Sequence, residues 1–569
     1  MKSFSLYIDL QAFKHCKQQV FTPVVPQAED LERQITFEGG QLNYEIEPRF
    51  KTVEGIAIAQ EQLSFINGMI YQFDNTVVKP EGLQEVHDVL QSKTENVSLC
   101  KGDFSGFVLK ASSAALFSNK TNSKPIFYYT SDTHLICASN VMAIAQILKA
   151  KGVPFDLDRE AAYSLLSFGY ILGDRTLIKG VSRLAAATIL KLDGTAITTQ
   201  QYHQFHTTAN TSQSECDFIE QLDQTFTKAI HNEFGRDQDL SLKHMTTISG
   251  GMDSRMVLAY AHQLGYTDQT AITFSQSHHA EHSIAQKVSQ FYQAQFKFYP
   301  LDGGDYLRNI DQPIAYNGGS CVYAGACHTL AMLKELDFEH YGILHTGQLG
   351  DAVLGTYLSG PKHETAAMGR SLSPHELSGK IQPYIQQQFD ASQNHELFKL
   401  YNKGFNEIFN GYRMIEQFTP FASAFMDEDF IQLSLTIPPH LKYDRKLYYK
   451  WMNAKVPSAT QIKLASTNVK PKMKYLQTPY SWIPKFNAYL NLAKYALLPG
   501  HVVSMNPFKK WFSENKELAN YIYQYGQDHL QYIAHDQELR DDCKKMLQQG
   551  FSDQFKAISL LSAVKQIWN

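Results

Sequence analysis

The sequence predicts an α/β protein in which a strand-rich N-terminal part precedes a doubly wound parallel sheet and a helical C-terminus. Three observations indicate this fold class. Short β segments dominate the first two hundred residues, strands and helices alternate between residues 217 and 299, and the last hundred-odd residues have mainly helical spacing. A chain of 569 residues also exceeds the range of one hydrophobic core, so we expect two or more domains.

The N-terminal strands are recognised by their β-branched and aromatic residues. Gly106 to Leu109, Pro125 to Tyr129 and Thr188 to Leu192 have this composition, and Gly, Asn, Asp or Ser bound them. The polar stretch HTTANTSQS (206–214) has the composition of a loop. We therefore predict a domain boundary there, between residues 1–206 and 207–569.

The parallel sheet is expected from the pattern that follows this linker. Helical and extended segments alternate in the order helix Asp217 to Glu233, strand Met245 to Ile248, helix Arg255 to Gln263, strand Ala271 to Phe274, helix Glu281 to Tyr292 and strand Phe296 to Tyr299. At the C-terminus, Phe551 to Ile567 is expected to form an amphipathic helix.

Charge and cysteine usage exclude several classes of function. With 52 basic and 56 acidic side chains the net charge is −4, so no basic excess favours a nucleic acid partner. Seven cysteines without a CxxC pair indicate neither a disulfide framework nor a thiolate metal site. No window approaches the roughly 18 apolar residues of a membrane span, and no signal peptide is recognised. We expect a cytoplasmic protein without a membrane partner.

The sharpest motif is SGGMDS (249–254), which lies directly between a predicted strand and a predicted helix. Its two glycines let successive N–H groups point at an anion, and the helix start adds free N–H groups and a positive dipole end. The hydroxyls of Ser249 and Ser254 would donate to phosphate, whereas Asp253 would approach phosphate through a bridging Mg²⁺. An ordinary glycine-rich turn with Asp and Ser caps is the alternative.

A second motif, TGQLGD (346–351), follows the apolar segment Gly342 to Leu344. In a doubly wound sheet, loops at the carboxyl ends of strands gather around one crevice. Asp253 and Asp351 would then share one cation and hold the pyrophosphate of ATP. A surface turn is the alternative for this motif alone.

Together these motifs resemble the asparagine synthetase family, and the resemblance runs through most of the chain. The matching segments are SGGMDS with SGGLDS, TGQLGDAVLGTY (Thr346 to Tyr357) with SGEGADELFGGY, TPFASAFMDEDFIQLSLTIPPHLK (Thr419 to Lys442) with RVPFLDHDLVEFALSLPPELK, KLYYK (Lys446 to Lys450) with KYILR, INGMIYQ (Ile66 to Gln72) with FNGEIYN, and KPIFYY (Lys124 to Tyr129) with KPLYY.

The resemblance implies a fold and a reaction. The N-terminal part would be a type 2 glutamine amidotransferase-like domain with the N-terminal-nucleophile sandwich fold, and the C-terminal part an ATP-pyrophosphatase synthetase domain. ATP would activate a carboxylate as an acyl-adenylate with release of pyrophosphate, and an amine would then form an amide and release AMP. ATP and Mg²⁺ are the implied cofactors.

The same resemblance assigns roles to individual residues. It places Ser249, Gly250, Gly251 and Ser254 on the phosphates, Asp253 and Asp351 on Mg²⁺, and Thr247, Ile272, Thr346 and Gly347 near the adenosine. Lys446 would stabilise charge that develops during acyl transfer.

Departures from the family pattern change this interpretation. Glutamine-hydrolysing members have Cys directly after the initiator Met, where this chain has Lys2, and Met69 replaces the Glu of NGEIYN. NKTNSKP (119–125) replaces DRxGxKP. We predict that glutaminase activity is lost, as in β-lactam synthetase, carbapenam synthetase and lasso-peptide cyclases. In the synthetase motif, Gln348 and Ala352 replace acidic residues, which weakens aspartate as the substrate.

Three functions remain open from the sequence. The first is a ligase acting on a carboxylate and an amine of a specialised metabolite, peptide or polysaccharide sugar acid. The second is an ammonia-dependent asparagine synthetase, and the third is a non-catalytic relative that binds ATP and regulates. Gln348 and Ala352 favour the third function, whereas Asp253, Asp351 and Lys446 oppose it. The oligomeric state is also open, a homo-oligomer included.

One motif is interpreted as a coincidence. HHAEH (278–282) matches the HxxEH pattern of inverted zinc proteases, but it lies between a predicted strand and its helix. A polar loop and a helix start explain it better than a zinc site.

Overall fold

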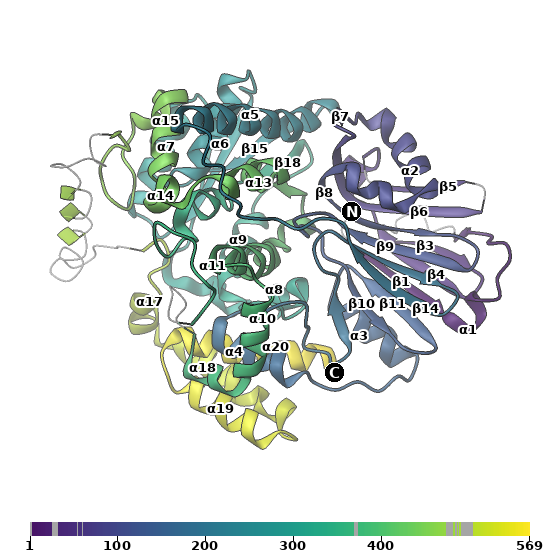
Figure 1. Cartoon of the computed structure of the whole chain (residues 1–569). Helices are drawn as coiled ribbons and strands as arrows, with labels where there is room; N and C mark the ends of the chain where they lie inside the picture. The colour runs from purple at the N-terminus through teal and green to yellow at the C-terminus, as the bar shows by residue number, and fades with distance from the viewer. Residues whose placement is uncertain are drawn as a thin grey trace.

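Three β-sheets organise the chain (Figure 1). The structure is a computed structural model, and it describes residues 3–24, 32–53, 55–59, 61–368, 374–473, 482–483, 486–487, 489–490 and 504–569. Lys2, at the position of the family's nucleophile, lies outside these residues. Two of the sheets belong to the N-terminal part and the third to the C-terminal part.

The N-terminal part contains two sheets in which every pair of neighbouring strands is antiparallel. Within the described residues, the first sheet has seven strands in the order β12 (Val181–Arg183), β10 (Phe127–Thr130), β11 (His134–Ala138), β1 (Ser3–Asp9), β4 (Gly40–Glu45), β3 (Glu32–Phe37) and β2 (Thr22–Val24). The second has the order β14 (Ala196–Gln201), β13 (Thr188–Asp193), β9 (Ser113–Ser118), β8 (Cys100–Leu109), β6 (Gln62–Phe73) and β5 (Gly55–Ala59), with β7 (Thr76–Val77) paired to β6.

These two sheets pack face to face through alternating apolar residues. Leu6 and Ile8 of β1 are fully buried against Phe65 of β6 and Phe107 of β8, whose rings stack with centroids 4.7 Å apart. Helices α2 (Leu83–Ser92) and α3 (Val141–Ala150) flank the sandwich. The predicted sandwich is confirmed.

The third sheet is entirely parallel, with the order β17 (Gln295–Pro300), β16 (Gln269–Ser275), β15 (Lys243–Thr247), β18 (Tyr341–His345) and β19 (Phe421–Ala422). Helices α5 (Glu215–Asp239), α6 (Asp253–Gln263) and α7 (Ala280–Phe291) pack around it. The predicted doubly wound sheet is thus confirmed. Its strand order reverses between β15 and β18, which is the topological switch point where such sheets bind ligands.

The C-terminus is helical, with α17 (Phe508–Glu514), α18 (Lys516–His529), α19 (Gln537–Leu547) and α20 (Phe551–Trp568). Figure 1 shows these yellow helices beside α4 (Arg159–Phe168). The prediction that the last helix is amphipathic was wrong. Residues Ala557 to Val564 of α20 are all buried, because α4, α8 (Asp311–Asn317), α18 and α19 surround it. No helix among the described residues is long and apolar enough to cross a membrane.

Ion pairs join the sandwich to the helices of the C-terminal part. Lys124 Nζ lies 2.7 Å from Glu416 Oε1, and these side chains are 4% and 7% exposed. Lys120 Nζ lies 2.5 Å from Glu428 Oε1 at the start of α13 (Glu428–Thr436). Both lysines belong to the NKTNSKP segment, in which Lys124 matches the family's KP and Lys120 stands where DRxGxKP has Arg, so this segment makes contacts between the two parts. The segment 206–214 is irregular, as expected, and the domain boundary there stays a prediction.

Candidate active site

The SGGMDS loop connects the end of β15 to the start of α6. Its backbone is fixed by its own serines: Ser249 N donates to Ser254 Oγ at 2.9 Å, and Gly251 N donates to Ser249 Oγ at 3.2 Å. Gly250 N instead donates to Oε1 of Glu281 at 2.8 Å. A carboxylate therefore already accepts from one of the loop N–H groups that the sequence assigned to phosphate.

The TGQLGD loop packs directly on the SGGMDS loop. A Cβ at Gly347 would lie 2.3 Å from the backbone nitrogen of Ser254, and one at Gly350 would lie 2.6 Å from Cγ of Asp253. Only glycine permits these approaches. The two motifs, about a hundred residues apart in the chain, thus meet at the switch point of the sheet, as the sequence predicted.

Asp253 and Asp351 lie together in this crevice, and both are partly buried. Burial and the neighbouring Asp351 carboxylate raise the pKa of Asp253 to about 7, although a hydrogen bond from Tyr448 and the charge of Arg445 oppose this. Burial also raises the pKa of Asp351, and Arg445 again opposes it. Two neighbouring carboxylates repel each other when both are ionised, and a divalent cation such as Mg²⁺ removes that repulsion. The pair is therefore a donor set that suits Mg²⁺.

Three other predicted ATP-binding residues lie on neighbouring strands. Thr247 ends β15 and Thr346 follows β18, whereas Ile272 lies in the middle of β16, where it pairs with Thr247. The Thr346 hydroxyl donates to the carbonyl of Ala422 at 3.1 Å, so this residue also ties the loop to β19. Their contact with adenosine stays a prediction.

Lys446 is exposed at the start of α15 (Lys446–Lys455), and its catalytic role also stays a prediction. Asp444 and Arg445 have left-handed φ angles of 58° and 60°, so α15 begins only at Lys446 and Tyr443 lies outside it. This turn leaves the Arg445 guanidinium as the cation whose charge acts on both aspartates.

The sequence argument missed two further contacts of the site. Tyr448 is fully buried, as expected of a core residue, but its hydroxyl donates to Oδ1 of Asp253 at 2.8 Å. Glu281 was expected only as an acidic residue at the start of a helix. In the HHAEH segment His279 caps α7 by accepting from Glu281 N at 3.2 Å, and the His282 ring stacks 3.7 Å from that of Phe298.

A pocket of about 500 Å³ opens beside Asp351. Two π-helical segments, Ala352–Thr356 and Leu400–Ile408, contribute to its wall, and π-helical turns are frequent at functional sites. Lys399, Lys403 and Glu407 line the pocket, because residues four positions apart lie on the same face of a helical segment.

Two polar atoms in this wall are buried and unsatisfied. Within the described part of the chain, the Tyr357 hydroxyl and Oε2 of Glu407 have no hydrogen-bond partner, and Tyr357 is 6% exposed. Unpaired buried polar groups of this kind are rare, and they mark places where a ligand or an ion can complete the site.

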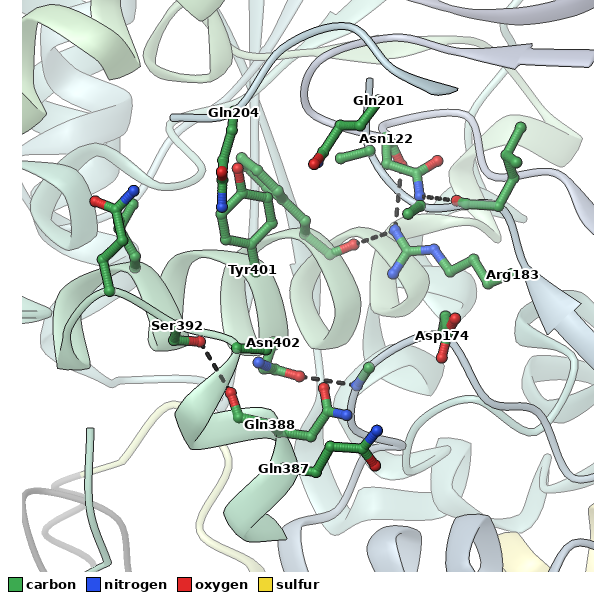
Figure 2. A pocket seen from close by; sticks show the side chains of 18 residues that line it. Asn122, Asp174, Arg183, Gln201, Gln204, Gln387, Gln388, Ser392, Tyr401 and Asn402 are labelled. Carbon is green, nitrogen blue, oxygen red and sulfur yellow. Dashed lines mark hydrogen bonds between the residues drawn. The ribbon is translucent and has the colours of Figure 1, made fainter. Parts of the chain in front are cut away.

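A second pocket, of about 420 Å³, lies on the other side of the segment Leu400–Ile408 and is shown in Figure 2. Of the described residues that line it, none belongs to the predicted ATP site.

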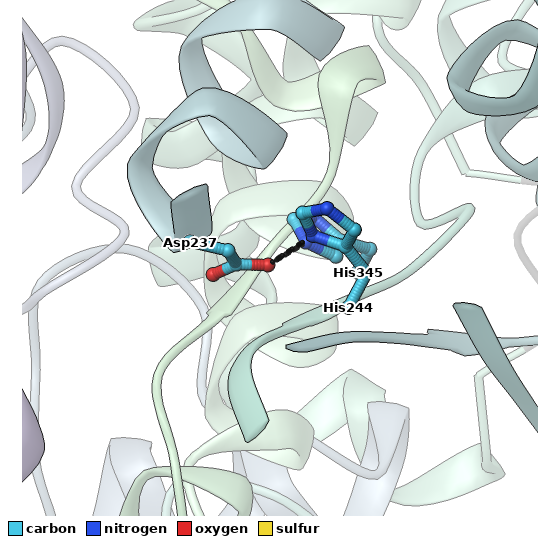
Figure 3. Close-up of side chains that lie close together, drawn as sticks. All are labelled: Asp237, His244 and His345. Atoms are coloured by element: carbon cyan, nitrogen blue, oxygen red, sulfur yellow. Dashed lines mark hydrogen bonds and ion pairs between the residues drawn. The ribbon is translucent and has the colours of Figure 1, made fainter. Parts of the chain in front are cut away.

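A buried charge cluster lies near the C-terminal end of α5 (Figure 3). Oδ2 of Asp237 lies 2.9 Å from Nδ1 of His244 and 2.8 Å from Nε2 of His345, and Oδ1 accepts from the backbone N–H of Ile343 at 2.8 Å. Among the described residues it is the one His, Cys, Asp and Glu group with metal-ligand spacing, its ligand atoms lying within 4.8 Å of one another.

Protonation explains this cluster without a metal ion. Burial alone would lower the pKa of His345, but the carboxylates of Asp237 and Glu233 raise it to about 9. His345 is therefore a cation at neutral pH, and it fastens α5 to β15 and β18 through Asp237.

In the N-terminal sandwich, Met69 stands where the family's motif has Glu. It is 2% exposed and packs with Phe50, Tyr71, Ile343 and Ala422 in an apolar cluster between the two parts of the chain. The thioether of Met69 cannot replace the carboxylate that Glu would offer to the ammonium group of glutamine.

Two family models match the chain in order. The model described as a glutamine amidotransferase domain matches residues 86–203, and the model described as asparagine synthase matches residues 221–417. No curated protein matches the chain. Two solved structures are similar at 8% sequence identity. Glutamine phosphoribosylpyrophosphate (PRPP) amidotransferase from B. subtilis, complexed with ADP and GMP, matches with a TM-score of 0.24 over 53% of this chain and 91% of that one. A structure of the allosteric regulatory enzyme of purine biosynthesis matches with a TM-score of 0.23 over 52% of this chain and 80% of that one.

Proposed function

This chain belongs to the asparagine synthetase-like family of ATP-dependent ligases, and from that premise we propose that it adenylates a substrate carboxylate and transfers the acyl group to an amine. The observation that carries the proposal is the meeting of Asp253, in the SGGMDS loop, with Asp351, in the TGQLGD loop, at the switch point of the parallel sheet. A carboxylate pair next to an anion-binding loop suits a nucleoside triphosphate together with its metal ion.

The reaction balances in two steps. A carboxylate oxygen of the substrate attacks the α-phosphorus of ATP, the bond from that phosphorus to the bridging oxygen breaks, and pyrophosphate leaves. The amine nitrogen then attacks the acyl carbon, AMP leaves with the oxygen of the mixed anhydride, and one proton is lost from nitrogen. One amide, one AMP and one pyrophosphate result.

The residues of this chain would bind the phosphates, hold the metal ion and position its ligands. The loop N–H groups and the hydroxyls of Ser249 and Ser254 would bind phosphate oxygens. Asp253 and Asp351 would hold Mg²⁺, which supplies positive charge to the pyrophosphate. Tyr448 orients Asp253, and Arg445 supplies a further positive charge close to both carboxylates.

The pocket beside Asp351 is the place we assign to the acyl substrate. It adjoins the metal-binding pair, and it offers Lys399 and Lys403 to anionic groups and Glu407 to a hydrogen-bond donor.

The proposal includes the loss of glutamine hydrolysis. Met69 is buried among apolar residues where the family's motif has Glu, and Lys120, where DRxGxKP has Arg, is engaged in an ion pair with Glu428. The amine would therefore be bound directly from solution or carried by the substrate.

ATP–pyrophosphate exchange with Mg²⁺ and a panel of carboxylates tests the proposal. We expect exchange with a subset of acids, its loss in Asp253→Asn, and native behaviour in Asp541→Asn, which changes an exposed aspartate on α19. Measurable ATP binding without exchange for any acid would contradict adenylation and favour a non-catalytic, ATP-binding role.

The charged lining of the pocket beside Asp351 favours a second candidate function, ammonia-dependent asparagine synthesis. Two lysines and a glutamate would complement an amino dicarboxylate, so ammonia-dependent asparagine synthesis belongs in the same assay. Asparagine formed from aspartate, ammonium and Mg-ATP would establish it, whereas exchange with other acids alone would exclude it.

A further inference from the structure

The pocket in Figure 2 lies where the N-terminal sandwich, the segment after β14 and the helices α10 (Gln382–Asp390) and α11 (His395–Lys399) meet. Its volume is about 420 Å³, which falls within the range of small-molecule sites. Tyr401 and Phe405 line this pocket, whereas Lys403 and Glu407 of the same π-helical segment line the pocket beside Asp351. The two pockets are therefore separate sites with a common wall.

Amide side chains dominate the lining. Among the described residues, the wall has five glutamines and two asparagines, which are Gln201, Gln204, Gln387, Gln388, Gln393, Asn122 and Asn402. Hydroxyls come from Ser392 and Tyr401, and the charged groups are Asp174 and Arg183, of opposite sign. A lining of this kind offers many donors and acceptors but no net charge.

Two buried polar atoms of this wall have no hydrogen-bond partner within the described residues. They are Oδ1 of Asn122 and Nε of Arg183, and these two residues are 3% and 6% exposed. The remaining groups of both side chains are occupied. Asn122 Nδ2 donates to the carbonyl of Leu184 at 2.7 Å, and the Arg183 Nη groups donate to Asn406 Oδ1 at 2.8 Å and the carbonyl of Phe405 at 2.7 Å. Both atoms are enclosed by protein, so the groups that a ligand in the pocket reaches are those of the exposed and half-buried members of the lining, among them Gln204, Gln387 and Gln388.

Asn122 belongs to the NKTNSKP segment, at the position where the family's DRxGxKP motif has glycine. Its φ angle of 53° is left-handed, a conformation that Asn tolerates better than most residues with a side chain. The replacement therefore keeps the turn and adds an amide to the pocket wall. The NKTNSKP segment thus contributes to a pocket that the ligase reaction does not require.

We propose that this pocket binds a neutral, polyhydroxylated ring of the size of a monosaccharide. A hydroxyl both donates and accepts, and so does a primary amide, so adjacent hydroxyls of a ring can pair with the planar amides of this lining. The half-buried Tyr401 ring supplies apolar surface for the C–H face of a sugar. Asp174 disfavours an anionic ligand, and Arg183 disfavours a cationic one.

Binding to the full-length protein tests the proposal directly. Glucose, galactose and N-acetylglucosamine are the sugar probes, triglycine is the amide probe, and isothermal titration calorimetry with saturation-transfer NMR is the measurement. We expect at least one sugar to bind with a dissociation constant of about 1 mM or tighter. Ala391→Trp, at the exposed rim of the pocket, should weaken that binding about tenfold or more, and so should Gln388→Ala.

Ala534→Trp is the matched control, because Ala534 is likewise an exposed alanine at a helix C-cap but lies outside the pocket lining. Its sugar binding should equal that of the native protein. Failure of every sugar to bind would overturn the proposal, as would sugar binding that survives both pocket substitutions. Triglycine binding that Ala391→Trp abolishes, without sugar binding, would assign the pocket to a peptide instead. None of these outcomes depends on ligase activity.

Discussion

The Tyr448 hydroxyl donates a 2.8 Å hydrogen bond to Oδ1 of Asp253, so helix α15 orients the carboxylate at the start of α6. The two residues are 195 positions apart in the chain. Tyr448 is fully buried, and its hydroxyl lowers the pKa of a carboxyl that burial and Asp351 raise. This contact connects the packing of the C-terminal part to the charge at the proposed metal site.

Removing that hydroxyl should impair adenylation. A hydrogen bond to a charged group contributes about 1.5–3 kcal/mol, so Tyr448→Phe should lower ATP–pyrophosphate exchange about tenfold or more. Tyr449→Phe, the next residue on α15 and only partly buried, should leave exchange within about twofold of the native rate. Equal rates in the two variants would show that the contact has no role in the reaction.

Glu281 should oppose nucleotide binding. Its carboxylate accepts from Gly250 N at 2.8 Å and adds negative charge next to the loop that would bind phosphate. Glu281→Gln keeps an acceptor oxygen and removes the charge, so we expect ATP to bind about three- to tenfold more tightly, by calorimetry. Glu517→Gln, another acidic residue in the first turn of a helix, should change nothing. Weaker ATP binding in Glu281→Gln would indicate that the carboxylate organises the loop or shares the metal.

Lys403 should act on the acyl substrate and not on ATP. It lines the pocket beside Asp351 from the exposed side. With an acid that supports exchange, Lys403→Gln should raise the KM for that acid about tenfold and leave the KM for ATP within about twofold. Lys544→Gln, an exposed lysine of α19, is the control. A larger effect on ATP would reassign Lys403 to the phosphates.

The parts of the site that were predictable from sequence are those encoded by local patterns. SGGMDS and TGQLGD each follow an apolar strand, and parallel strands end at one edge of a sheet, so the meeting of Asp253 and Asp351 could be expected. The parallel sheet and the strands of the sandwich were recognisable for the same reason, because side-chain periodicity is a local property.

The contacts that were missed depend on long-range packing. Tyr448 has the composition and burial of a core residue, and only the left-handed turn at Asp444 and Arg445 directs α15 at Asp253. Glu281 satisfies the helix-start pattern whether or not it contacts Gly250. The burial of α20 on most of its faces follows from the helices that surround it, which its own spacing does not reveal.

The cluster around His345 should make the stability of the fold depend on pH. Asp237 and Glu233 raise the pKa of His345 from 6.5 to about 9 against the effect of burial, and burial raises that of Glu233 from 4.5 to about 7. The folded protein thus holds both protons more tightly than the unfolded chain. The resulting stabilisation is complete below pH 4.5 for Glu233 and 6.5 for His345, and it is lost as the pH rises through 7 and 9.

We therefore expect the melting temperature to fall between pH 4.5 and 7 through Glu233 and between pH 6.5 and 9 through His345, with each group contributing up to about 1.4 kcal/mol per pH unit in its own range. Calorimetric scans at a series of pH values measure this. His345→Asn should flatten the fall in addition to lowering stability, whereas His340→Asn, an exposed control, should keep the native profile. A His345→Asn profile parallel to the native one would contradict the assignment.

The buried ion pair between Lys124 and Glu416 should matter more for stability than any surface pair of the sandwich. Its side chains are 4% and 7% exposed, so Lys124→Ala leaves a buried carboxylate without its partner and should cost about 3–5 kcal/mol. Lys191→Ala breaks a pair whose side chains are each 37% exposed and should cost about 1 kcal/mol or less. Thermal unfolding compares the two variants. The double change Lys124→Met with Glu416→Leu should recover much of the loss, because apolar side chains of similar size need no partner. If the double variant is as unstable as Lys124→Ala, the charges themselves are not what joins the two parts of the chain.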